Sequence, residues 1–250
     1  GVTIAAGSTS VQVRVATTDD FALEGDEDFT LTATVTAGTT ANASATGTAT
    51  ITDDVDVTTV ALTATPSVAE GGSITYTATL SSAAVTAMAV TLSSGQTINI
   101  AAGATVGSLS IAAPGDDPYL DAGIVARSIA STTGGGFESL SIDATAAETT
   151  VTDTIDVTSA TLTATSSVAE GGQITYTVAL GAAVTGSAVN VLLANGQTVT
   201  IPVGSSSNSV VAIAPDNLYG GGATVGNSIV SASGGNFEQL TADTTPVSTT

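Results

Sequence analysis

The sequence predicts an all-β protein of tandem antiparallel β-sandwiches, and three observations support this fold class. The chain repeats itself at an interval of about 100 residues. Apolar residues alternate with polar ones over short stretches, which is the period of a half-buried strand. Turn-forming Gly, Pro and Ser residues separate these stretches, and no window shows a capped helical pattern.

The repeat is visible in two long matches. The words LTATPSVAEGGSITYT begin at Leu62, and LTATSSVAEGGQITYT begins at Leu162. In the same way ITDDVDVT, from Ile51, returns as VTDTIDVT from Val151. Self-similarity at a fixed interval indicates one structural unit used several times.

The N-terminal stretch matches only the second half of the repeat. TIAAGSTSVQVRVATTDDFALEG, from Thr3, aligns with NIAAGATVGSLSIAAPGDDPYLDAG, from Asn99. We therefore expect a C-terminal half repeat at 1–54, a complete repeat at 55–154, and a repeat at 155–250 that ends before its own acidic junction.

The alternating stretches are the expected strands. Clear examples lie at 11–15, 29–35 and 74–80, and the turns between strands contain Gly71, Gly72 and further Gly residues. About seven short strands in roughly 100 residues are typical of an immunoglobulin-like sandwich. Because Cys and Trp are absent, the antibody type is excluded.

The charge is strongly negative. Asp and Glu number 22 against two basic residues, Arg14 and Arg127, which gives a formal net charge of -20. Nucleic acid and anionic membranes are therefore excluded as partners, and no apolar run is long enough to span a membrane. Without His, Cys or Lys the usual nucleophiles and general bases are missing, so we expect no enzyme. A carboxylate pair could cleave glycosides, but the chain has few aromatic residues to form a sugar cleft.

The acids recur at three places in the repeat: the turn before the paired glycines, a mid-repeat loop and the junction to the next repeat. These places hold Glu70 and Glu170; Asp19, Asp20, Glu24, Asp116, Asp117, Asp121 and Asp216; and Asp53, Asp54, Asp56, Asp153 and Asp156. In a sandwich whose strands run end to end, all three places can fall at one pole. Calcium binds six to eight oxygen ligands, so we expect Ca²⁺ at these acids. The junctions lack Gly and Pro, which indicates a stiff connection.

Simpler interpretations stand beside this one. An Asp in a turn often only caps the backbone, and Glu70 could be a solvated turn residue. The Thr-x-Thr runs fit the outward faces of ordinary strands. Arg127 shares the parity of inward-facing residues, so either its strand lies at a sheet edge or its guanidinium bonds a nearby acid.

A family resemblance covers all 250 residues. The frame SVAEGG, a DD-x-x-x-(E/D)-G loop as in DDFALEGDEDF, and a final ITDD resemble the Calx-beta-like, immunoglobulin-like extender repeats of giant RTX-type, type I-secreted bacterial adhesins. The resemblance implies stacked modules with calcium at poles and junctions, on the cell surface or outside the cell. It implies as ligands Asp19, Asp20, Glu24, Asp53 and Asp54 in the first unit and Glu70, Asp116, Asp117, Asp121 and Asp153 in the second. The third repeat departs from the pattern, with Asn217 in place of the second loop Asp and Gly221 in place of the later acid.

The expected function is thus a structural extender that gives an adhesin reach for adhesion or biofilm formation, with neighbouring repeats as partners. Two alternatives remain open at this point. One is a subunit of an extracellular filament, in which a strand from another chain completes the half repeat. The other is a module that binds a sugar or a protein.

Overall fold

The computed structural model describes residues 1–216 and 223–250, and every element in these two ranges is a β-strand. The predicted all-β fold class is confirmed. The chain forms two compact units. The first comprises Gly1–Ala64, Thr75–Ser110 and Ala126–Glu148, and the second comprises Thr65–Ile74, Ile111–Val125 and Thr149–Thr250. Within the described ranges, no helix has the length and apolarity needed to cross a membrane.

The first unit contains three sheets, with strand orders β1-β2, β10-β6-β7 and β11-β3-β5-β8. On β5 the apolar residues Ile74, Tyr76, Ala78 and Leu80 are buried and the Thr residues between them are not. This alternation is the one predicted from the sequence. The strands are β1 (Glu27–Thr34), β2 (Ser44–Ile51), β3 (Val57–Ala64), β5 (Ser73–Leu80), β6 (Met88–Leu92), β7 (Thr97–Ile100), β8 (Val106–Ala112), β10 (Ile129–Gly134) and β11 (Ser139–Ile142).

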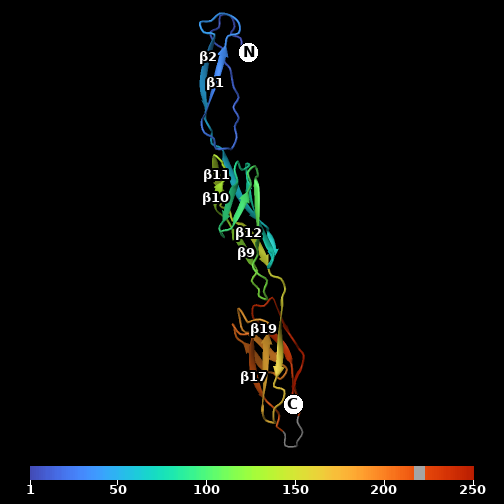
Figure 1. The fold of residues 1–250 in the computed structure, drawn as a ribbon. Coiled ribbons are helices and arrows are strands. Elements are labelled where there is room, and N and C mark those ends of the chain that lie inside the picture. The colour runs from blue at the N-terminus through green and yellow to red at the C-terminus, as the bar shows by residue number, and fades with distance from the viewer. Residues whose placement is uncertain (217–222) are drawn as a thin grey trace. The chain divides into compact units, whose positions relative to one another are not determined.

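The half repeat forms a two-stranded hairpin of β1 and β2, drawn in blue in Figure 1. The strand expected at 11–15 is wrong, because these residues form no strand and are exposed. The reason lies in the pairing of the complete repeat. There the matching strand, β8, is hydrogen-bonded to β5, and residues 1–54 contain no counterpart of β5.

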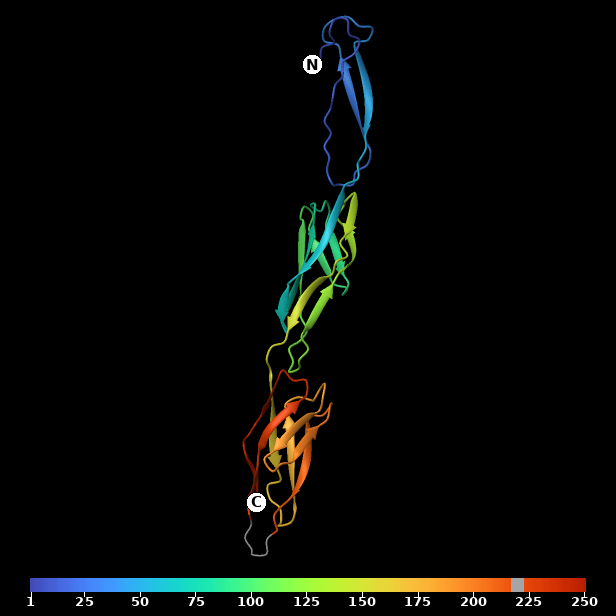
Figure 2. The ribbon, with the colours of Figure 1, turned by 180° about the vertical axis from the view of Figure 1, so that it is seen from behind.

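The second unit contains four sheets, with strand orders β4-β12-β9, β17-β14-β13-β20, β16-β15-β19 and β18-β21. Figure 2 shows the last three in yellow to red. The strands are β4 (Ser67–Ala69), β9 (Gly123–Arg127), β12 (Ala147–Thr152), β13 (Val157–Ala164), β14 (Gln173–Leu180), β15 (Val189–Leu193), β16 (Thr198–Ile201), β17 (Ser207–Ile213), β18 (Val225–Asn227), β19 (Ile229–Gly234), β20 (Gln239–Ala242) and β21 (Val247–Thr249).

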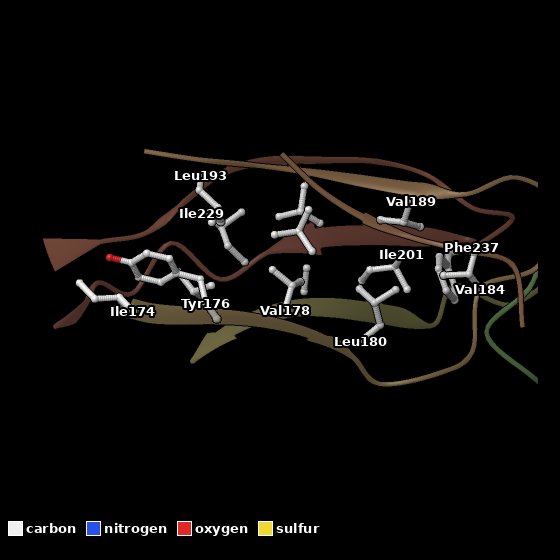
Figure 3. Packing of buried hydrophobic residues seen from close by; sticks show 14 of the residues in the cluster. Ile174, Tyr176, Val178, Leu180, Val184, Val189, Leu193, Ile201, Ile229 and Phe237 are labelled. Carbon is white, nitrogen blue, oxygen red and sulfur yellow. The ribbon is translucent and has the colours of Figure 1, made fainter. Parts of the chain in front are cut away.

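The core of the third repeat lies between its two larger sheets. Tyr176, Val178 and Leu180 point from β14 into this space, and Phe237 lies at one end of it (Figure 3). All of these side chains are buried. The buried residues of this core are aliphatic apart from Tyr176 and Phe237. Aliphatic side chains from both sheets must therefore interdigitate closely to exclude water.

Among the described residues, three of the strand pairs are parallel. β3 pairs with β11, β4 with β12, and β13 with β20 in parallel register. In each pair a strand from the start of a repeat lies beside one from its end. This pairing brings the opening turn of a repeat next to its C-terminal junction, and it is what positions the candidate site.

Candidate metal centre

The turn SVAEGG places Glu70 by backbone contacts on two sides. The Glu70 N–H donates to the carbonyl of Thr152 at 3.0 Å, and the Gly71 N–H donates to the carbonyl of Pro114 at 2.7 Å. Gly71 has a φ of 70°, and a Cβ on Gly72 would lie 2.6 Å from Val68 Cγ2. The two glycines are thus required by backbone conformation and by close packing, respectively.

Three carboxylates meet at this turn, one from each predicted place. Glu70, Asp121 and Asp153 each offer an oxygen, and these oxygens lie within 4.8 Å of one another. Glu70 Oε1 accepts a hydrogen bond from the Thr154 N–H at 2.9 Å, and Asp153 Oδ1 accepts one from the Asp121 N–H at 3.3 Å. The turn, the loop and the junction of one repeat therefore meet at one point.

Glu70 is the least solvated member of the group. Only 6% of its surface is exposed, so it is not the solvated turn residue that the sequence left possible. Its Oε2 atom is buried and has no hydrogen-bond partner among the described residues. Leaving a buried carboxylate oxygen without a partner is costly. A cation bound among the three carboxylates would satisfy this atom.

A fourth carboxylate was missed by the sequence analysis. Glu238 accepts a hydrogen bond from the Asp156 N–H at 2.5 Å through Oε2, and its negative charge raises the pKa of Glu70. Its Oε1 atom is buried without a partner among the described residues. The signal that could have revealed it is the repeated Phe-Glu pair, at Glu138 and Glu238.

The electrostatics of the group favour a cation. The Thr154 hydrogen bond lowers the pKa of Glu70, but burial and the negative charges of Glu238 and Asp153 outweigh it, so the pKa is raised. The Arg127 guanidinium donates a hydrogen bond to the carbonyl of Ala126. Its strand, β9, is the edge strand that the sequence analysis offered as one explanation.

The loop before Asp121 contacts the turn between β19 and β20, which carries Glu238. The rings of Tyr119 and Phe237 are stacked with centroids 5.5 Å apart, and the Tyr119 hydroxyl donates to the carbonyl of Ala183 at 2.7 Å. The Leu120 N–H donates to the Asn236 carbonyl at 3.0 Å. We call the contact of loop 116–123 with turn 234–238 the docking contact. It joins two consecutive repeats.

A related arrangement lies in the first unit. Five predicted ligands line a hollow of about 290 Å³, and all of them are exposed: Asp19, Asp20, Glu24, Asp53 and Asp54. The negative charge of Asp54 raises the pKa of Asp19, and the charges of Asp56 and Asp20 add to this effect. The Glu24 N–H donates to Asp53 Oδ2 at 3.1 Å.

Glu138 in the first unit is the counterpart of Glu238. It accepts a hydrogen bond from the Asp56 N–H at 2.5 Å, and its Oε1 is buried without a partner among the described residues. That hydrogen bond lowers the pKa of Glu138, but burial and the charges of Asp53, Asp56 and Asp54 raise it overall.

The remaining predicted residues lie apart from these groups or serve the backbone. Asp117 Oδ1 accepts the Tyr119 N–H at 2.9 Å, which makes it a local cap, while Asp116 accepts a hydrogen bond from the Thr154 hydroxyl. In the third repeat Glu170 and Asp216 are exposed. The expected departures at Asn217 and Gly221 lie outside the described residues.

A known protein family matches most of the chain. No curated protein matches the chain. The model of one family, the LapA domain, matches residues 56–154 and again residues 156–250. LapA is a large adhesin involved in biofilm formation, and this match and the all-β fold indicate a structural protein. The chain belongs to the LapA-domain family.

Proposed function

We propose that the chain is an extender segment of a cell-surface or secreted adhesin, of the type I-secreted RTX type, in which calcium stiffens the connection between β-sandwiches. The family match supports the adhesin role. The absence of His, Cys and Lys from the chain supports a mechanical role over a catalytic one.

The buried Glu70 carboxylate carries the calcium part of the proposal. Its Oε2 atom has no partner among the described residues and lies in a group with Asp121 and Asp153. Hard oxygen ligands of this kind are those that calcium prefers. Glu70, Asp121 and Asp153 would hold the ion, and the ion would supply the positive charge that their oxygens lack.

The mechanical effect follows from where these residues lie in the chain. Glu70 follows β4, Asp121 belongs to the loop before β9, and Asp153 follows β12 directly. An ion held by all three would tie the junction after β12 to the body of its repeat. Extracellular modules bind calcium with dissociation constants of about 10⁻⁴ to 10⁻³ M, so such a site fills outside the cell and stays empty in the calcium-poor cytosol. The junction would then resist bending outside the cell and bend more easily in the cytosol.

The test measures calcium binding, thermal melting and small-angle scattering on the full chain, with calcium and then with EGTA. At about 10 mM calcium, a site with such a constant gains about 1.4 to 2.7 kcal/mol, so the melting temperature should rise and the spread of molecular dimensions should narrow. Glu70→Gln should remove one binding event. The matched control is Glu148→Gln, an exposed residue on β12. A wild-type chain whose melting and scattering ignore calcium would contradict the proposal.

One observation favours a second candidate, the filament subunit. The hairpin of the half repeat presents an apolar hollow of about 440 Å³, lined by Val13, Val15, Phe29 and Leu31 among others. A strand from another chain could pair with the hairpin edge and cover this face. The test is the sedimentation coefficient measured at increasing protein concentration. End-to-end polymers would support the filament function, and a monomer at all concentrations would exclude it.

A further inference from the structure

The first and last strands of the third repeat lie side by side and run in the same direction. β13 pairs through residues 157–160 with all of β20 in parallel register. We infer that this parallel contact lets the repeat carry tension, because it loads the terminal strands in shear. The inference goes beyond the proposed function, since the contact consists of hydrogen bonds within the protein and needs no cation.

The parallel contact continues past the end of β13. The Thr250 N–H donates to the Ser166 carbonyl at 3.1 Å, and the Val168 N–H donates to the Thr250 carbonyl at 3.0 Å, as in a parallel ladder. Beside them the Thr249 hydroxyl donates to the Thr165 carbonyl at 2.6 Å, and Thr249 is buried. We call these bonds, together with the pairing of β13 and β20, the terminal clamp.

The direction of the strands decides how tension acts on the terminal clamp. In a parallel pair, the N-terminal end of one strand and the C-terminal end of the other lie at opposite ends of the pair. Tension on the repeat enters before β13 and leaves after β21. It therefore slides the first and last strands past each other and loads their hydrogen bonds together. Two strands pulled apart at the same end would instead lose one bond at a time.

Both sides of the terminal clamp are also tied to the rest of the repeat. β13 pairs with β14 in antiparallel register, and β21 pairs in the same way with β18. The side chains of Ala160 and Leu162 on β13 are buried in the core. Sliding β13 must therefore break bonds to two neighbouring strands and expose apolar surface to water, which is unfavourable.

The second repeat has the same side-chain bond one repeat interval earlier. The Thr149 hydroxyl donates to the Thr65 carbonyl at 2.7 Å, and Thr149 is buried. The adjacent Thr150 N–H donates to the Pro66 carbonyl at 3.0 Å, beside the parallel pair of β4 and β12. Thr149 and Thr249 thus each add a buried hydroxyl bond to a parallel contact between the start and the end of a repeat.

The test is single-molecule force spectroscopy on the full chain in EGTA. Cysteine attachment points can be placed freely, because the chain has no cysteine of its own. Ile155→Cys with Thr250→Cys pulls along the terminal clamp, and Ile155→Cys with Gln239→Cys pulls at one end of the β13–β20 pair. All three positions are exposed, and Thr250 keeps both backbone bonds. The first geometry should need about twofold more force at equal pulling speed, since the evenly spaced bonds of a parallel pair share a sliding load.

Thr249→Val tests the side-chain bond, because Val keeps the shape of Thr and removes the hydroxyl. Losing one hydrogen bond that breaks before the transition state should raise the unfolding rate at constant force about 2- to 12-fold when the terminal clamp is sheared. The rate should change little in the second geometry, where opening begins at the far end of β13. Thr249→Ser, which keeps the hydroxyl, should recover most of the loss.

The matched control is Thr177→Val. It removes a hydroxyl bond to Ser209 between β14 and β17, away from the terminal clamp, so its effect should be the same in both geometries.

Two results would overturn the inference. A Thr249→Val effect of equal size in the two geometries would mean that the hydroxyl bond adds only general stability. An unfolding force no higher along the terminal clamp than across the β13–β20 pair would exclude the clamp itself, whether or not the Val variant folds. Calcium is absent from these measurements, so a wild type that ignores calcium would refute the proposed calcium function and leave the terminal clamp standing.

Discussion

The docking contact depends most directly on Tyr119, and replacing this residue tests the contact without touching a carboxylate. Tyr119→Ala removes the ring stacked on Phe237 with centroids 5.5 Å apart and the hydroxyl bond to Ala183 at 2.7 Å. Aromatic pairs contribute about 0.5–1.5 kcal/mol beyond area burial, and a hydrogen bond contributes a net of about 0.5–1.5 kcal/mol. The docked arrangement should therefore lose about 1–3 kcal/mol, which lowers the ratio of docked to undocked molecules about 5- to 150-fold.

The assay is a double-mutant cycle with Phe237→Ala in urea unfolding followed by circular dichroism. Phe237 is also part of a buried core, so its single variant measures more than the contact, and only the cycle isolates the pair. We expect a coupling free energy of about 0.5–1.5 kcal/mol. Tyr119→Phe should lose only the hydroxyl contribution.

A substitution in the first unit tests the same ring contact by adding an aromatic ring instead of removing one. Ala22 occupies the position of Tyr119 and bridges to Phe137, so Ala22→Tyr should add stability where Tyr119→Ala removes it. A Tyr119–Phe237 coupling below about 0.3 kcal/mol lies within the error of additivity and would refute the docking argument.

Three further predictions concern stability. Gly234→Ala should lower the melting temperature more than Gly196→Ala does. Both glycines have a positive φ, but only at Gly234 would a Cβ lie 2.2 Å from a backbone oxygen, that of Ala188. Equal losses of stability in the two variants would contradict this steric explanation. Tyr76→Phe should raise the unfolding free energy by up to about 1–3 kcal/mol, because the buried Tyr76 hydroxyl has no partner among the described residues, and a loss of stability would reveal one. Hydrogen bonds from the Thr245 hydroxyl and N–H lower the pKa of Asp243 in the folded state below its unfolded value of 3.8. The ionised carboxylate therefore stabilises the fold at pH values above 3.8, and this contribution is lost as the pH falls through the lower folded pKa. Asp243→Asn should make stability less dependent on pH in that range, and an unchanged acid unfolding transition would count against this reasoning.

Some of the fold and of the site could be predicted from local pattern. The alternation along 74–80 correctly assigned the buried and exposed faces of β5, because side chains in a strand point to opposite sides. The same reasoning failed at 11–15, where alternation is present but the partner strand is not. A strand needs a hydrogen-bonded neighbour, and periodicity does not report whether one exists.

The acids show the same division. Their recurrence at three places in the repeat predicted that Glu70, Asp121 and Asp153 would come together, and the structure brings these three within 4.8 Å. It also shows that Asp117 caps its own loop. The spacing of acids in the sequence could not distinguish an Asp that caps the backbone from an Asp that joins the carboxylate group, since both are Asp residues in a turn.

By itself the sequence determined the all-β class, the repeat interval and the places where negative charge gathers, because each is written in local order and in self-similarity. Only the tertiary structure decided that Glu70 is buried, with an oxygen that has no partner among residues 1–216 and 223–250, and that Tyr119 stacks on Phe237 of the following repeat. Tyr119 and Phe237 are separated by more than one repeat interval. Contacts between residues so far apart depend on how the strands pair and pack, which no local pattern encodes.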